Sequence, residues 1–172
     1  MESYPQSRGV HRAIRRIAAS RLMARVFGVI QQPLDELVYR LSGERSTLSA
    51  WLSGIEVSML TTTGSKTGKP RTLPVLALPD GEDVILIASN FGRSRHPGWY
   101  HNLRADPRAK VVTAGVIREF VARELSGVER ARCYARAEEL FPPFTRYPRW
   151  AGMREIPVLR LQAGGPRGRA RA

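Results

Sequence analysis

Cysteine and histidine are scarce in this chain, and their scarcity removes several kinds of site. The 172 residues include one cysteine, Cys133, and three histidines. A single thiol excludes an intramolecular disulfide and a zinc site built from thiolates, and it suits the reducing cytoplasm, where the protein is expected to reside. His11, His96 and His101 are too few and too scattered in the sequence to predict a metal centre.

Long apolar runs and nucleophile signatures are also missing. No stretch of about 18 apolar residues occurs, so no membrane-spanning helix is expected. The first residues lack the apolar segment of a secretory signal. The chain carries no recognisable Ser–His–Asp or paired-carboxylate signature.

Basic residues outnumber acidic ones, and the formal net charge is +13. Six arginines against one acid fall within residues 1–26, and four arginines without an acid fall within residues 160–172, so the body is only mildly basic. No recognisable nucleic-acid-binding module accompanies this charge, and no specific nucleic-acid partner is expected. The pattern of residues 10–27 predicts a basic helix. We favour packing of this segment on the rest of the protein, or disorder, over peripheral contact with an anionic membrane.

The remainder of the chain predicts one domain of mainly β structure with some α (α+β), a small antiparallel barrel of about six strands. Strands are expected at 57–63, 71–78, 84–89, 109–113, 117–126 and 157–161, and helices at 34–41, 97–104 and 128–141. Residues 1–50 would form an N-terminal helical segment, residues 51–162 the barrel, and residues 163–172 a flexible basic tail.

Three local signals refine this prediction. Residues 79–83 have the composition of a turn. Ser126 and Glu129 have the spacing of a capping box for the last helix, on which Cys133 is expected to be buried. Pro74 cannot donate a hydrogen bond to a strand ladder, so its strand is expected at a sheet edge or an interruption.

Two glycine-bearing and cation-bearing segments, residues 59–72 and 89–103, carry the functional signal. Glycine lets backbone N–H groups come close to a phosphate, and fixed cations neutralise it, so a small-molecule phosphate site is the leading hypothesis. A Walker A loop is excluded because three residues separate Gly64 from Gly68 and Pro70 follows Lys69. For this hairpin loop alone, ordinary solvated lysines are the competing interpretation.

Together these segments resemble the deazaflavin-dependent nitroreductase family. The similarity rests on residues 61–74, the strand ending at residues 88–90, residues 97–107 and residues 154–158, and it spans residues 20–162 in the family's order. The resemblance implies a split β-barrel related to flavin-binding reductases. It also implies an oxidoreductase that uses reduced coenzyme F420 as hydride donor and a quinone, nitro or other electrophilic acceptor.

The resemblance assigns roles residue by residue. The anionic tail of the cofactor would meet Ser65, Lys66, Thr67, Arg71 and Thr72, and its apolar ring would lie beside Leu73, Pro74, Val75 and Leu76. The cofactor pocket would be completed by Ile87, Ala88, Ser89, Asn90, Gly98, Trp99, Tyr100, His101, Asn102 and Phe144. Phe141, Phe144 and Tyr147 would line the substrate side, and Ser89 and Tyr147 are the candidate donors to developing negative charge. For Trp99, core packing is the alternative role.

The chain departs from the family pattern at two places. Asn90 stands where relatives often have lysine, a change for which Arg93 or Arg95 would compensate. Phe141 and Phe144 stand in a segment where relatives often carry tyrosines, and only Tyr147 keeps a hydroxyl. We therefore expect apolar quinones or hydrophobic enones to be better acceptors than nitroimidazoles.

Two other classes of function stay open at this level. A split barrel can instead hold FMN or haem, or bind F420 as a carrier or sensor without turnover. More distantly, the arginine-rich ends would serve a nucleic-acid or membrane-surface binding protein. The physiological acceptor and the oligomeric state are not predicted.

Overall fold

The computed structural model describes residues 57–152 and 154–164, and the predictions for residues 1–56 and for residues 165–172 of the basic tail lie outside this range. Ala163, which the sequence prediction placed in the tail, ends the last strand. The strands are β1 (Ser58–Thr63), β2 (Pro70–Val75), β3 (Leu78–Asp80), β4 (Asp83–Ile87), β5 (Arg108–Thr113), β6 (Val116–Glu124) and β7 (Val158–Ala163). The helices are α4 (Gly98–Ala105), α5 (Gly127–Leu140) and α6 (Tyr147–Ala151), with 3-10 turns η1 (Asn90–Gly92) and η2 (Pro142–Thr145).

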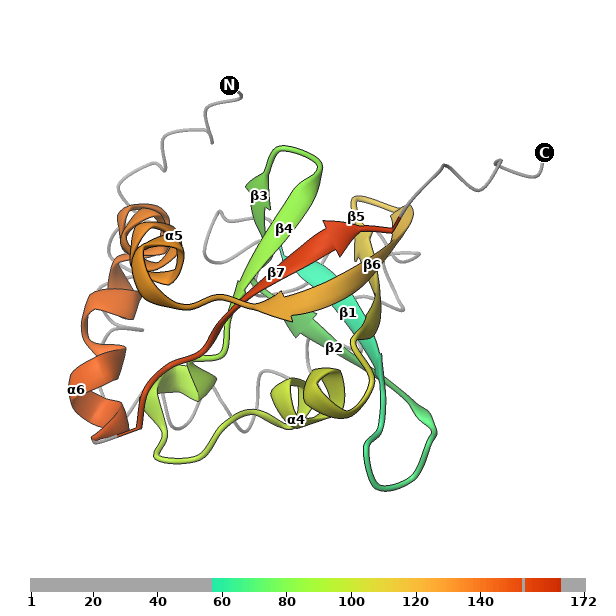
Figure 1. The fold of residues 1–172 in the computed structure, drawn as a ribbon, viewed down its shortest axis with the longest axis horizontal. Coiled ribbons are helices and arrows are strands. Elements are labelled where there is room, and N and C mark those ends of the chain that lie inside the picture. Colours follow the sequence, from blue (N-terminus) through green and yellow to red (C-terminus); the bar gives the residue numbers. More distant parts are fainter. Residues whose placement is uncertain (1–56, 153, 165–172) are drawn as a thin grey trace.

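The seven strands form one antiparallel sheet in the order β2-β1-β5-β6-β7-β4-β3. The edge strands β2 and β3 are joined by only Leu76 and Ala77. Three residue steps span at most about 11 Å, whereas the edges of a flat sheet of this width would lie about 29 Å apart. The sheet must therefore curl until its edges approach, and Figure 1 shows the resulting half-barrel. The predicted small antiparallel barrel is confirmed.

The inner core fills this barrel. Leu60, Val111, Phe120 and Leu161 point inward from four neighbouring strands, as the two-residue alternation of a strand requires. Helix α4 closes one end and adds three further buried side chains, Trp99, Tyr100 and Leu103. Trp99 is 8% exposed, so core packing is one of its roles.

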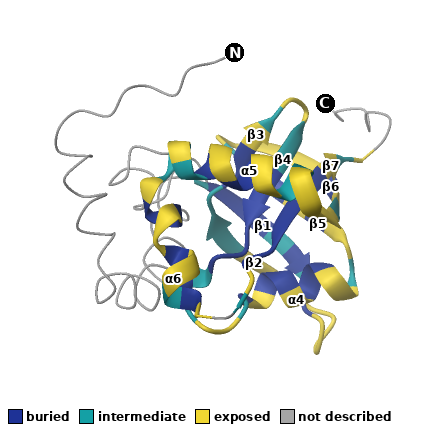
Figure 2. Cartoon of the chain, turned by 60° about the vertical axis from the view of Figure 1, so that its left-hand side comes forward, coloured by how far each residue is buried: buried dark blue, intermediate teal, exposed yellow. Residues whose placement is uncertain are grey.

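The outer core lies on the opposite face of the sheet. Ile85, Ile87 and Val158 point outward from β4 and β7 and are covered by α5, η2 and α6. Figure 2 shows the buried stripes of these helices turned toward the strands and their exposed stripes turned away. Cys133 is buried here on α5, as predicted. None of the helices in the described ranges is both long and apolar enough to cross a membrane.

Most strand predictions match the observed bounds, and two local predictions need correction. Residues 78–80 form a seventh strand, which the sequence prediction divided between a strand and a turn. Ser126 is the N-cap residue of α5, but its side chain makes no capping hydrogen bond, so the predicted capping box is wrong. The Glu129 carboxylate instead pairs with Arg123 at 2.9 Å and with Arg160 at 3.2 Å. Pro74 does lie in an edge strand.

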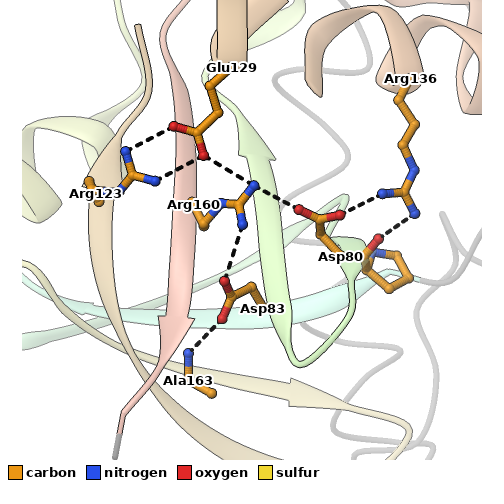
Figure 3. Close-up of polar contacts among 8 residues, drawn as sticks. Asp80, Asp83, Arg123, Glu129, Arg136, Arg160 and Ala163 are labelled. Carbon is orange, nitrogen blue, oxygen red and sulfur yellow. Dashed lines mark hydrogen bonds and ion pairs between the residues drawn. The ribbon is translucent and has the colours of Figure 1, made fainter. Parts of the chain in front are cut away.

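Arg160 stands at the centre of a charge network that joins the outer strands to α5 (Figure 3). Its guanidinium lies 2.9 Å from the Asp80 carboxylate and 3.5 Å from that of Asp83, besides its contact with Glu129. Arg136 of α5 also pairs with Asp80, at 2.8 Å. Although Arg160 falls in the arginine-rich C-terminal stretch, its charge is neutralised within the fold.

Replacing Arg160 should destabilise the fold more than replacing an exposed arginine. Arg160→Leu leaves three carboxylates without their shared cation, and we expect a loss of about 2 to 4 kcal/mol in the free energy of unfolding. The matched control is Arg108→Leu, because the Arg108 side chain is 81% exposed and, among the residues that the structure describes, pairs only with Asp106. Urea denaturation measures both variants, and equal losses would contradict this role for the network.

A candidate cofactor site at one end of the barrel

The loop between β1 and β2 is a tight hairpin, as predicted. The Gly64 amide donates to the Lys69 carbonyl oxygen at 2.9 Å, and the Gly68 amide donates to the Gly64 carbonyl oxygen at 2.7 Å. Gly68 has a φ of +66°, a conformation that side-chain-bearing residues rarely adopt. Ser65, Lys66 and the other side chains of residues 65–69 are exposed, so this loop presents its cations to solvent.

Asn102 joins this loop to the second glycine-bearing segment. Its side-chain oxygen accepts a hydrogen bond from the Ser65 amide at 3.0 Å, and its side-chain nitrogen donates to the Thr62 hydroxyl at 3.0 Å. Asn102 is 9% exposed, and a buried amide of this kind must have both of its polar ends bonded. The structure thus brings the two segments together, and the Asn102 side chain is used to hold them.

Edge strand β2 is exposed in its first half and half-buried in its second. Arg71 and Thr72 are exposed, and the Thr72 hydroxyl lies 2.8 Å from that of Thr61 on the neighbouring strand. Residues 73–76 are half-buried: Leu73 and Val75 pack on the inner core and Leu76 on the outer core. One edge therefore offers cations at one end and an apolar strip at the other.

The chain turns sharply after β4. Asn90 and Phe91 have φ values of 48° and 56°, and Gly92 follows at 71°. Ser89 before the turn is buried, and the Asn90 side chain donates to the Arg95 carbonyl oxygen at 2.9 Å. The predicted cofactor-binding residues 87–90 thus lead from a buried strand into a turn of left-handed residues.

Gly92 packs this turn against α6. A Cβ atom on Gly92 would lie 2.9 Å from the Trp150 Cβ and 3.3 Å from the Tyr147 Cα. The close contact brings the predicted substrate segment next to the end of β4. Sequence reasoning missed Gly92 as a packing residue, since only the partner helix reveals the need for a small side chain here.

The predicted substrate residues belong to the outer core. Phe144 and Tyr147 are buried and Phe141 is half-buried, with edge-to-face ring contacts at 5.1 and 5.7 Å between neighbours. Burial raises the pKa of Tyr147, so its hydroxyl keeps its proton at neutral pH. Tyr134 was not predicted; its hydroxyl donates to the Phe144 carbonyl oxygen at 3.1 Å, and burial raises its pKa to about 12.

A cluster of rings lies beside α4. The His96 ring centroid is 4.9 Å from that of Tyr100 and 5.9 Å from that of His101, so two of the three histidines are neighbours in space. The Tyr100 hydroxyl donates to the Glu124 carboxylate at 3.0 Å. Burial and then the nearby Arg154 guanidinium lower the pKa of His96.

Arg154 is the residue that sequence reasoning placed in a motif without giving it a role. Its guanidinium donates to the carbonyl oxygens of Ala88 at 3.1 Å, Ser89 at 2.7 Å and Arg93 at 3.0 Å. These contacts surround the turn after β4. The motif of residues 154–158 was the available signal that Arg154 matters. Its partners could not be predicted, because each contact joins residues that are 61 to 66 positions apart in the sequence.

The curled antiparallel sheet with few helices is that of a split-barrel protein. The family model described as F420H(2)-dependent quinone reductase matches residues 35–162, and this chain belongs to that family. The resemblance found in the sequence is confirmed in so far as the family is one of F420H(2)-dependent reductases. The matching family is named for quinone reduction, whereas the resemblance named a nitroreductase family.

Individual relatives agree with this assignment. The F420H(2)-dependent quinone reductase Rv1261c of Mycobacterium tuberculosis is 38% identical over 93 residues, which are 54% of this chain and 61% of that protein. This chain therefore spans about three fifths of the curated relatives that it first matches. A solved F420-H2-dependent reductase, FDR-A, is 34% identical with a TM-score of 0.57, over 62% of this chain and 93% of its own.

A further solved structure, described as a domain-swapped dimer, is 30% identical with a TM-score of 0.60. The match covers 74% of this chain and 95% of that one. The split-barrel fold predicted from the sequence is thus confirmed by two relatives whose own chains are almost fully covered.

Gly92→Ala should destabilise the protein more than the same change at Gly81. Both glycines have a positive φ, 71° and 68°, but a Cβ on Gly81 would meet nothing within 4 Å. We expect Gly81→Ala to lose about 1 to 2 kcal/mol through backbone strain alone. Gly92→Ala should lose about 1 to 3 kcal/mol more, because its Cβ collides with α6. Thermal and urea unfolding measure the difference, and equal losses would contradict the close packing.

Proposed function

We propose that this protein is an oxidoreductase that transfers a hydride from reduced coenzyme F420 to a quinone. Its family membership supports both the cofactor and the class of acceptor. The observation that carries the proposal is the pair of Asn102 hydrogen bonds, which hold the lysine-bearing loop against α4 and gather two glycine-bearing segments at one end of the barrel.

The residues of β2 and its loop fit this cofactor. Coenzyme F420 joins an apolar deazaflavin ring to a tail that carries a phosphate and glutamate carboxylates. Lys66, Lys69 and Arg71 are exposed at the start of the edge strand, and the half-buried residues 73–76 follow. The cations would bind the tail, where the planar fork of Arg71 can hold two anion oxygens at once. The apolar strip would support the ring.

The chain's contribution to the reaction is positioning and electrostatics. Bound reduced F420 supplies the hydride. The protein would orient the acceptor, exclude water and donate hydrogen bonds to the oxygen on which negative charge develops. We propose the hydroxyls of Ser89 and Tyr147 as these donors.

The aromatic segment favours an apolar acceptor. Phe141 and Phe144 carry no hydroxyl, and the hydroxyl of nearby Tyr134 is already bonded to a backbone carbonyl oxygen. A quinone ring gains from apolar contact, whereas a nitroimidazole needs hydrogen bonds at its nitro group. We therefore propose quinones as good substrates and nitroimidazoles as poor ones, in contrast to the nitroreductase name of the family resemblance.

A redox titration tests the proposal against the other cofactors and against carriage without turnover. Anaerobic protein with reduced F420 is titrated with a quinone, and the oxidised cofactor is followed by its fluorescence. We expect F420 and quinone to react in equal molar amounts, since each exchanges two electrons. Tighter binding of FMN than of F420 in calorimetry, or no oxidation beyond that of a protein-free control, would overturn the proposal.

Loss of either loop cation should weaken cofactor binding. We expect Lys66→Ala and Arg71→Ala each to lose about 1.5 to 3 kcal/mol of F420 binding free energy, the scale of a hydrogen bond to a charged group. Arg132→Ala removes the same charge from an exposed position on α5 and should have little effect. Calorimetry at two salt concentrations measures the change, and salt should weaken the wild type more than either loop variant.

Normal F420 binding by both loop variants would show that Lys66 and Arg71 are ordinary solvated residues. A loss shared with Arg132→Ala would show instead that only the net charge matters.

A hydroxyl added at the edge of the aromatic segment should improve nitroimidazole reduction. Phe141→Tyr is preferred to Phe144→Tyr because Phe141 is only half-buried, whereas Phe144 is 4% exposed and a hydroxyl there would disturb the core. One new hydrogen bond in the transition state is worth about 0.5 to 1.5 kcal/mol, which is roughly threefold to tenfold in rate. Steady-state kinetics with a quinone and a nitroimidazole at fixed reduced F420 measure the ratio.

The wild type should strongly prefer the quinone in the same assay. Rapid nitroimidazole reduction by the wild type, unchanged in Phe141→Tyr and in the double Phe141→Tyr, Phe144→Tyr variant, would show that this segment does not select the acceptor.

A further inference from the structure

We infer that Arg154 is a positioning residue, which holds the turn after β4 in the conformation that forms one wall of the cofactor site. This inference deepens the proposed function and rests on it. It concerns residues 88–93, which include the predicted cofactor residues Ser89 and Asn90.

The three arms of the guanidinium are all engaged. Nη2 donates to the Ser89 carbonyl oxygen at 2.7 Å, Nη1 to that of Ala88 at 3.1 Å and Nε to that of Arg93 at 3.0 Å. Nη1 also lies 3.1 Å from Nδ1 of His96. An arginine fork is rigid and planar, so these bonds fix the positions of the two sides of the turn relative to each other.

The turn needs such support because its conformation is unfavourable. Asn90 and Phe91 both lie in the left-handed region, which is unfavourable for a residue with a side chain, more so for phenylalanine than for asparagine. Strained residues of this kind persist only where their surroundings enforce them. Arg154 binds carbonyl oxygens on both sides of the strained pair, before Asn90 and after Gly92.

The bonding partners of Arg154 also indicate positioning rather than ion pairing. Within the described ranges, Arg154 forms no salt bridge with a carboxylate, and each of its hydrogen-bond partners is a neutral acceptor. A guanidinium has no acceptor, so Nδ1 of His96 must accept and the ring proton sits on Nε2. Arg154 therefore orders both the turn and the imidazole that packs on Tyr100 of α4.

Two variants at Arg154 and two matched controls test the inference. Arg154→Lys keeps the charge but loses the fork, and Arg154→Gln loses both. Arg130→Lys and Arg130→Gln are the controls, because Arg130 is also partly buried and also donates to a backbone carbonyl oxygen, that of Ile156 at 2.8 Å. Arg130 pairs in addition with Glu155 at 3.0 Å, and it bonds to none of the turn residues that Arg154 holds. Each variant is assayed for thermal stability, F420 affinity and turnover of a quinone.

The expected pattern separates positioning from mere stability. We expect kcat to fall about 10- to 100-fold in Arg154→Gln, the effect of a small misplacement of reacting groups, with a partial recovery in Arg154→Lys. F420 affinity should fall in the same order. The Arg130 variants should show a similar change in melting temperature with kcat and F420 affinity within about twofold of wild type.

An NMR titration of the histidines gives a readout that does not depend on turnover. The groups that face His96 are Arg154, His101, Glu124 and Arg104. In the wild type, burial and Arg154 lower the pKa of His96 below its ordinary value. Loss of the cation in Arg154→Gln should raise this pKa, and the amide signals of residues 89–93 should move in the same variant but not in Arg130→Gln.

These experiments separate failure of the positioning role of Arg154 from failure of the proposed reductase function. A wild type that neither binds nor oxidises F420 would overturn both. An active wild type with Arg154→Lys and Arg154→Gln equal to the Arg130 controls in kcat, F420 affinity and amide signals would overturn the positioning role alone. Should Arg154→Gln fail to fold, Arg154→Lys decides by the same comparison.

Discussion

The curl of the sheet is the constraint on which the rest of this structure depends. Two residues, Leu76 and Ala77, connect strands at opposite edges of a seven-stranded sheet, so the sheet cannot lie flat. The curl encloses the inner core on the concave face of the sheet, and α5 and α6 cover the outer core on the convex face. It also places Leu76, in the connection between the two edge strands, against the outer core that contains Phe144.

Two long-range polar ties then arrange the loops at one end of this barrel. Asn102 holds the lysine-bearing loop to α4, and Arg154 holds the turn after β4 to the segment before β7. Neither tie is an ion pair; both satisfy backbone groups of loops. Loops that lie on a rigid sheet and are held by such bonds lose less freedom when a ligand binds, which favours tight and oriented binding.

Much of this arrangement could be predicted from sequence, because its signals are local. Alternation of apolar side chains located the strands, Pro74 indicated a sheet edge or an interruption, and four segments taken together led to the family: residues 61–74, 88–90, 97–107 and 154–158. The network at Arg160, the packing of Gly92 on α6 and the partners of Arg154 could not be predicted. Each depends on residues tens of positions away, and Glu129 followed those distant cations rather than its local capping position.

We propose that segments 64–69, 88–93 and 98–102 form one binding site for coenzyme F420. Titration of isotope-labelled protein with F420, followed through the backbone amide signals, tests it most directly. We expect the signals of these three segments to shift together and to saturate at one ratio of cofactor to protein. Shifts confined to α5 or to the turn between β5 and β6, with these segments unchanged, would contradict it.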